Sequence, residues 1–249
     1  MRSWFFRHVD DPRIRAVTFD VFDTVLLRNT KPERLRFFEI ASELTIELAA
    51  RGYPVSKEAA FHARALSHEI AYRTAPMNRF QREAKFEDIG KLVARALSLS
   101  DPSLVDVIQE VELRYEEQNL RGNRAIIELL AEARSRGKKL FFLSDMYLSN
   151  AQVRRLLARA AADLTVDGGY VSSESSLSKH AGGLFDLFCE SEGFAPHELL
   201  HVGDNAHSDV ASPRAKGWNA LHLPRGKAFQ WARAARELHT TALLKRLLP

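Results

Sequence analysis

The sequence predicts an α/β fold: a parallel β-sheet with helices on both faces and an all-helical segment inserted after the first strand. Two patterns lead to this prediction. Between Pro32 and about Leu120, apolar side chains recur every three or four residues, which is typical of helices. After residue 122, short apolar runs alternate with helical patterns, and strands that are joined by helices pair in parallel.

The first expected strand is an apolar run that ends on a carboxylate, Val17-Thr18-Phe19-Asp20. We interpret it as a buried strand that carries an acidic nucleophile into the following loop. The alternative is an aspartate that only caps the end of a strand.

The inserted segment is expected to hold about four helices and no strand. Gly52-Tyr53-Pro54 ends the first helix, and Ser56 is a credible N-cap for the second. Pro76 and Asp101-Pro102 supply two further breaks.

The remainder of the chain predicts strands alternating with helices. The expected strands cover residues 139–143, 169–171, 199–202 and 219–223. The expected helices cover residues 124–136, 150–162, 181–193 and 208–216, and a final helix follows. In such a sheet, ligands bind beyond the carboxyl ends of the strands, where Asp20, Ser144 and Asp204 all fall. We therefore expect these three side chains to converge on one crevice.

Composition narrows the class of protein. The 249 residues are 45% hydrophobic, enough to bury a substantial core. The single cysteine, Cys189, allows no disulfide within the chain, and the N-terminus lacks the apolar core of a signal peptide, so a reducing, cytoplasmic setting is expected. The net charge is +4, and the charged residues are scattered along the chain, so we expect no nucleic-acid or membrane partner. The excess of basic residues suits a small anionic substrate. The oligomeric state stays open.

Four segments together resemble the motifs of the haloacid dehalogenase superfamily with a helical C1-type cap. They are residues 17–24, the strand ending at Ser144-Asp145, Ser178-Lys179, and Gly203-Asp204 running on to Asp209. The resemblance implies a Rossmann-like core of residues 1–29 and 122–249 and a helical cap of residues 30–121. The sequences of residues 19–24 and 144–149 are most similar to a bacterial subgroup of predicted hydrolases, some fused to or encoded beside glycosyltransferases. This similarity implies a phosphosugar or surface-polysaccharide setting.

The resemblance also implies roles for individual residues. Asp20 would be the nucleophile that forms an aspartyl-phosphate, Thr24 would orient it, Ser144 would donate a hydrogen bond to the phosphoryl group, and Lys179 would neutralise charge. Phosphoryl transfer depends mainly on positioning and charge neutralisation, so a divalent cation is expected, and Mg²⁺ prefers oxygen ligands. The implied ligands are Asp20, the backbone carbonyl of Phe22, Asp204 and Asp209, although both later aspartates could instead cap the following helix.

Substrate contacts are expected from the cap and the loop tips. The candidates are Asp145 and Asn205 in the core, and Arg64, His68, Arg73 and Arg79 in the insert, since guanidinium groups bind phosphate bidentately. Asp145 could equally be a cap of its own loop.

One departure from the family pattern matters. Most phosphatases of this superfamily carry a second aspartate two residues after the nucleophile as the general acid, and here that position is Phe22. Asp23 follows, but on an extended chain adjacent side chains point to opposite sides, so it is not expected to take over. The substrate could have a good leaving group or supply its own acid, a cap residue such as His62, His68 or Asp88 could enter the site, or activity could be lost.

Three hypotheses follow, in order of preference. The first is a Mg²⁺-dependent phosphohydrolase acting on a small phosphorylated metabolite. The second is a weakened or inactive binding or regulatory protein of the same fold. The third is a metal-independent hydrolase of carbon–halogen bonds.

Overall fold

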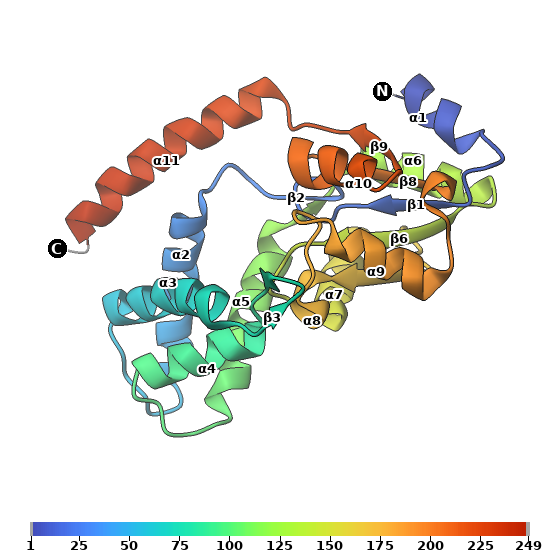
Figure 1. Ribbon diagram of the computed structural model, residues 1–249. Helices are drawn as coiled ribbons and strands as arrows, with labels where there is room; N and C mark the ends of the chain where they lie inside the picture. The colour runs from blue at the N-terminus through green and yellow to red at the C-terminus, as the bar shows by residue number, and fades with distance from the viewer. Residues whose placement is uncertain (1, 248–249) are drawn as a thin grey trace. The chain divides into compact units, whose positions relative to one another are not determined.

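The computed structural model describes residues 2–247, which form two compact units (Figure 1). Among these residues, 2–28, 76–83 and 120–225 make up the first unit. Residues 29–75, 84–119 and 226–247 make up the second. No helix in this part of the chain is both long and apolar enough to cross a membrane.

The first unit is built on a five-stranded sheet in the order β7-β6-β1-β8-β9, and every neighbouring pair is parallel. The strands are β1 (Ala16–Phe19), β6 (Lys139–Ser144), β7 (Gly168–Val171), β8 (Leu199–Gly203) and β9 (Asn219–His222). This architecture confirms the predicted fold class. Because β1 lies in the middle of the sheet, its carboxyl end is flanked by the ends of β6 and β8.

Helices and two short ladders complete this unit. The helices are α1 (Arg2–Val9), α6 (Arg124–Ser135), α7 (Asn150–Ala160), α8 (Ser172–Ser175), α9 (Gly183–Glu192) and α10 (Ser212–Ala215), with a 3₁₀ turn η1 (Pro196–Glu198) and a π-helical segment η2 (Ala206–Ala211). The antiparallel ladders pair β2 (Leu26–Leu27) with β5 (Arg121–Gly122), and β3 (Met77–Asn78) with β4 (Gln81–Arg82).

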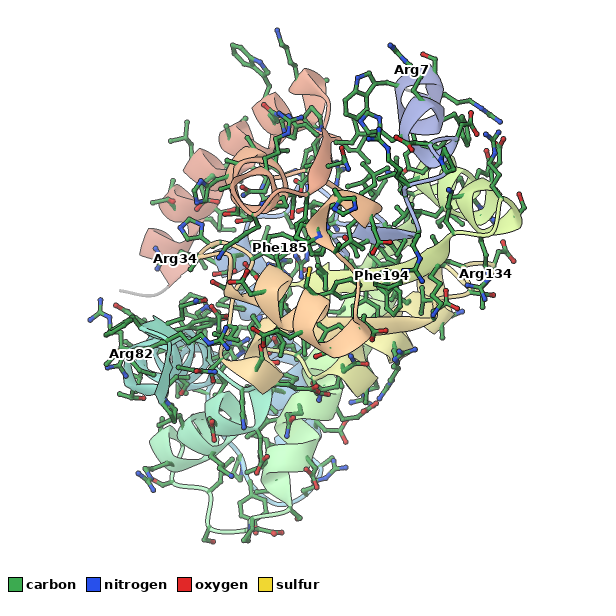
Figure 2. All side chains as sticks on the ribbon, turned by 45° about the vertical axis from the view of Figure 1, so that its right-hand side comes forward. Arg7, Arg34, Arg82, Arg134, Phe185 and Phe194 are labelled. Carbon is green, nitrogen blue, oxygen red and sulfur yellow. The ribbon has the colours of Figure 1, made fainter. Side chains whose placement is uncertain are left out.

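Alternate side chains of a strand point to opposite faces of the sheet, so a strand that has helices on both faces contacts both layers. Phe141 of β6 packs with Phe185 and Phe188 of α9 and with Phe194 in one buried cluster. Phe185 and Phe194 are labelled in Figure 2. The next residue, Phe142, points the other way, where Arg154 of α7 lies over its ring at 5.5 Å. Such two-sided burial explains why the strands are almost uniformly apolar.

The second unit contains the helices α2 (Glu33–Ala49), α3 (Lys57–Thr74), α4 (Phe86–Ala96), α5 (Leu104–Asn119) and α11 (Lys227–Leu247). Ser56 caps α3 as expected, since its side chain accepts a hydrogen bond from the backbone of Ala59. Two buried ion pairs join these helices: Arg64 to Glu112, and Arg36 to Glu116. Helices α2 to α5 are the four expected in the insert.

The prediction that no strand interrupts the insert was wrong. Residues 76–83 form the β3–β4 hairpin, which belongs to the first unit rather than to the helical one. The reason is polar bonding to distant residues, because Gln81 accepts from Ser178 and Asn78 donates to the backbone carbonyl of Ser175. Helix α1 was also not predicted, and residues 226–247 group with the second unit instead of the expected core.

The close contact between β6 and β7 gives a test of this sheet. A Cβ added at Gly169 would lie 2.1 Å from the ring of Phe142, whereas one added at Gly226 would meet nothing within 4 Å. Gly169→Ala should therefore lower the free energy of unfolding by about 1–3 kcal/mol through overpacking. Gly226→Ala is the matched control. Equal urea midpoints for the two variants would contradict the placement of β7 against Phe142.

Candidate active site

The candidate site lies at the carboxyl edge of the sheet in the first unit. Asp20 directly follows β1, and its backbone N–H donates to the carbonyl of Val202 in β8 at 2.9 Å. Ser144 is the last residue of β6, and Asp204 directly follows β8. The structure thus brings together the three strand ends at which the sequence predicted functional residues.

Lys179 lies at the centre of this edge. Its ammonium donates to the carboxylates of Asp20 and Asp209, at 2.6 Å in each case, and all three side chains are almost fully buried. Burial disfavours the charged form of Lys179, but the two carboxylates outweigh this and hold its pKa above the ordinary value. The lysine is therefore a fixed positive charge next to Asp20.

Only one of the two carboxylate oxygens of Asp20 accepts a hydrogen bond from the described residues. Its Oδ1 accepts from Lys179, whereas its buried Oδ2 has no hydrogen-bond partner among the described residues, nor does the buried hydroxyl of Thr24. Burial raises the pKa of Asp20 to about 7, against the opposing effect of Lys179 and with a further increase from Asp209. Buried polar atoms without partners are rare in native proteins, and these two fit a ligand that the protein binds here.

Asp209 is held by a chain of buried hydrogen bonds. Its Oδ1 accepts from Lys179 and from Nε2 of His201 at 3.1 Å, and its Oδ2 accepts from the backbone N–H of Asn205 at 2.9 Å. The other ring nitrogen of His201 lies 2.7 Å from the hydroxyl of Thr18. Since a carboxylate can only accept, His201 donates from Nε2 and accepts from Thr18, which fixes its tautomer.

Burial governs the charges along this chain as well. It lowers the pKa of His201, which keeps the imidazole neutral near pH 7. Burial would raise the pKa of Asp209, but Lys179 and His201 outweigh it and hold that pKa well below its ordinary value. Asp209 is therefore ionised and accepts from three donors, so its clearest role is to position Lys179.

Local backbone structure explains how Asp209 reaches this position. A Cβ at Gly203 would lie 2.3 Å from the carboxyl carbon of Asp209, so only glycine leaves room for that side chain. Asp209 lies in the π-helical segment η2, whose first turn is capped by the side chain of Asn205. Asn205 accepts hydrogen bonds from the backbones of His207 and Ser208, and its role as a substrate contact stays a prediction.

Asp204 also lies close to Asp20, with a carboxylate oxygen of each within 4.8 Å of the other. Burial raises the pKa of Asp204 to about 6, and the charges of Asp23 and Asp209 add to the shift. Asp23 is not on an extended chain: its φ of +65° places it in a turn, so the expectation that it points away from the site used the wrong backbone geometry. Its carboxylate pairs with Arg225 at 2.7 Å.

The loop that carries Lys179 is fixed by Asp145. One oxygen of Asp145 accepts from the backbone N–H of Lys179 at 2.7 Å and the other from that of His180 at 3.0 Å. The sequence left open whether Asp145 meets the substrate or its own loop, and the structure shows that both oxygens bind this loop. A contact with substrate stays a prediction.

Of the expected cap contacts, Arg64, His68 and Arg73 lie in the second unit, whereas Arg79 lies in the hairpin segment of the first unit. Arg64 is 1% exposed and binds both oxygens of Glu112, at 2.6 and 2.7 Å, while its guanidinium lies 4.1 Å from the ring centroid of Phe37. His68 packs against Phe37 and Tyr72 in the same unit. Both remain candidates for substrate binding.

The donor set fits a divalent cation. Asp20, Asp204 and Asp209 each offer a carboxylate oxygen, and these three atoms lie within 4.8 Å of one another. Lys179 supplies only one positive charge to this group of three carboxylates. Hard carboxylate oxygens at this spacing match what Mg²⁺ requires. The carbonyl of Phe22 stays the predicted additional ligand.

Several residues of the site were missed by sequence reasoning. Thr18 and His201 are polar residues in otherwise apolar strands, and the register pairs them directly, so this pattern could have predicted their contact. Arg225 and Glu83 gave no such signal. Both belong to the first unit, and their positions depend on contacts with residues far away in the sequence.

The comparisons with known proteins agree on the fold. The sequence profile of the haloacid dehalogenase-like hydrolases matches residues 14–217. No curated protein matches the chain significantly in sequence.

Solved structures with the same fold include both dehalogenases and phosphatases. A 2-haloacid dehalogenase from Pseudomonas syringae pv. Tomato is 18% identical, with 84% of this chain and 86% of that one covered and a TM-score of 0.58. A HAD phosphatase from Thermococcus onnurineus is 21% identical, with coverages of 86% and 88% and a TM-score of 0.55. A putative HAD-hydrolase from Bacillus subtilis bound to magnesium is 16% identical, with coverages of 85% and 89% and a TM-score of 0.51.

The buried pair in the helical unit gives a test of whether Arg64 is structural. Arg64→Leu leaves Glu112 buried without its partner, so the free energy of unfolding should fall by about 3–5 kcal/mol. The double variant Arg64→Leu/Glu112→Leu should recover most of that loss, as measured by urea denaturation. If Arg64→Leu changes KM and leaves the urea midpoint unaltered, Arg64 is instead a substrate contact.

Proposed function

The chain belongs to the haloacid dehalogenase-like hydrolase family, and on that basis we propose that it is a Mg²⁺-dependent phosphohydrolase. Its substrate would be a small, anionic, phosphorylated metabolite, with a phosphosugar as the first class to examine. The reaction would proceed through a transient aspartyl-phosphate on Asp20.

One observation carries this proposal: the group of three carboxylates around Asp20, Asp204 and Asp209. Displacement of a halide by a carboxylate needs a nucleophile but no cation; Asp209 would still position Lys179, but Asp204 would be a cost without a function. Burial already raises the pKa values of Asp20 and Asp204, which shows that their negative charges lack sufficient compensation in the protein alone. A bound cation and an anionic phosphoryl group together provide that compensation.

The residues of the site suit a displacement at phosphorus. Asp20 attacks through its unpaired Oδ2, because a carboxylate needs no base to activate it. Lys179, fixed by Asp209, neutralises charge next to the nucleophile, and the hydroxyl of Thr24, four residues after Asp20, is buried. Mg²⁺, held by Asp20, Asp204 and the carbonyl of Phe22, would supply further neutralisation of the transferring group.

Cleavage of a carbon–halogen bond is the second candidate. It is favoured by Phe22, which leaves the nucleophile without a carboxyl two residues on, and by the dehalogenases among the structures of the same fold. In that reaction Asp20 would displace halide from carbon, and water would then cleave the ester. The two reactions differ in their need for a metal.

Asp20→Asn tests both the nucleophile and the reaction class. Because the amide is a much poorer nucleophile, hydrolysis of acetyl phosphate and an aryl phosphate with Mg²⁺ should fall by about 10³-fold or more. The wild-type activity should disappear with a strong chelator and return with Mg²⁺. Chelator-resistant release of halide from a 2-haloacid would instead establish the second candidate, and metal binding without either activity would indicate a regulatory protein.

Binding of Mg²⁺ should depend on pH in a defined direction. In the metal-free protein the pKa values of Asp20 and Asp204 are raised to about 7 and about 6, above the usual 3.8, so the folded state keeps protons that the unfolded chain has lost. The stability that these groups contribute is therefore present below about pH 4 and is lost as the pH rises through 6 to 7.

Mg²⁺ must displace these protons, so its binding should tighten as the pH rises from 5.5 to 8 and should release protons near pH 6. Calorimetry in buffers of different ionisation enthalpy measures both effects. Asp204→Asn should release fewer protons. A dissociation constant that stays flat over this range would contradict the assignment of Asp20 and Asp204 as ligands.

A further inference from the structure

The proposed reaction needs a proton donor that the strand ends do not supply. When the bond between phosphorus and the leaving oxygen breaks, the electron pair stays on that oxygen, and a simple alkoxide needs a proton. Asp20 forms the new bond, and position 22 is a phenylalanine. Lys179 is held between two carboxylates that raise its pKa, and Asp209 is ionised and accepts from three donors, so neither gives up a proton readily.

The β3–β4 hairpin brings another acid to the same edge of the sheet. Although it is part of the insert in sequence, it packs in the first unit against the loop that carries Lys179. The side-chain oxygen of Gln81 accepts from the backbone N–H of Ser178 at 2.7 Å and from its hydroxyl at 3.1 Å. The amide of Asn78 donates to the carbonyl of Ser175 at 2.8 Å. These bonds fix the hairpin relative to the residue next to Lys179.

Glu83 is the last residue of this hairpin segment. Its Oε2 accepts from the hydroxyl of Ser172 at 2.8 Å, and the same hydroxyl accepts from the backbone N–H of Met146 at 3.1 Å. Ser172 directly follows β7, and Met146 lies two residues after the end of β6. The carboxyl of Glu83 is therefore attached to two loops at the carboxyl edge, where Asp20 leaves β1.

The environment of Glu83 suits a group that carries a proton. It is half-buried, and no cation is paired with it among the described residues. Burial raises its pKa to about 7; the hydrogen bond from Ser172 opposes this, and the charge of Asp145 adds to it. A half-buried carboxyl without a cationic partner costs free energy, and such groups concentrate at functional sites.

We infer that Glu83 donates the proton to the leaving oxygen, directly or through one water, in the reaction proposed above. In the first step Oδ2 of Asp20 bonds to phosphorus, the bond to the leaving oxygen breaks, and that oxygen takes the proton of Glu83 and departs as an alcohol. In the second step the Glu83 carboxylate takes a proton from water, whose oxygen bonds to phosphorus. The bond to Asp20 breaks, and phosphate and the free Asp20 carboxylate are restored.

The geometry of an in-line displacement favours a donor outside the strand itself. The leaving oxygen lies on the side of phosphorus opposite Asp20, so its proton should come from a segment that packs over the loops rather than from the nucleophile's own turn. The hairpin is such a segment, and its placement in the first unit makes Glu83 part of the site. This inference rests on the proposed function and extends it by one residue.

The test compares two leaving groups in the full-length protein with Mg²⁺. An aryl phosphate has a leaving oxygen that needs little protonation, whereas an alkyl phosphate depends on the donor. Glu83→Gln should lower kcat/KM, which reports only the steps through departure of the leaving group, by about 10²-fold or more for the alkyl ester and by less than about threefold for the aryl ester. Glu87→Gln, which removes an exposed acid of α4 paired with Lys91, is the control and should change neither.

The outcomes separate the two proposals. If the wild type hydrolyses both esters and Glu83→Gln lowers kcat/KM equally for the two or for neither, the assignment of Glu83 is wrong and the proposed function stands. If the wild type hydrolyses neither, the proposed function itself fails. Urea midpoints show whether Glu83→Gln is folded; if it is not, Glu83→Asp replaces it, and a larger loss for the alkyl than for the aryl ester supports the assignment while equal losses overturn it.

Discussion

The contact on which the site depends is the placement of one ammonium between two carboxylates. Lys179 lies 2.6 Å from both Asp20 and Asp209, in a volume from which water is largely excluded. Removing Lys179 would leave two buried carboxylates uncompensated, which is far more costly than losing a surface ion pair. The glycine at position 203, the π-helical turn that follows and the pair of Thr18 with His201 all serve to hold Asp209 in this arrangement.

Much of the core could be predicted from the sequence because its physical signals are local. Strands buried on both faces are short apolar runs, and the loops after them carried Asp20, Ser144 and Asp204. Because the strands pair in parallel, their carboxyl ends meet at one edge of the sheet. The helical insert was predictable for the same reason, since its period and its N-cap at Ser56 are encoded within a few residues.

The features that were missed depend on contacts between distant residues. The hairpin at residues 76–83 has little apolar content, and its strands exist because Gln81 and Asn78 find polar partners almost a hundred residues away. The turn at Asp23 is set by a positive φ that its own sequence does not demand. Arg225 binds Asp23 across 202 positions, a pairing to which no sequence period corresponds.

The order of the strands also has a consequence for biosynthesis. β1 ends at Phe19, but its neighbours β6 and β8 begin at Lys139 and Leu199, and the helices α2 to α5 lie between. As the ribosome makes the chain from its amino end, the central strand emerges first and stays without either neighbour until most of the protein is translated. Such long sequence separations slow folding and leave an apolar segment open to association with other nascent chains, so this strand should depend on chaperones during synthesis.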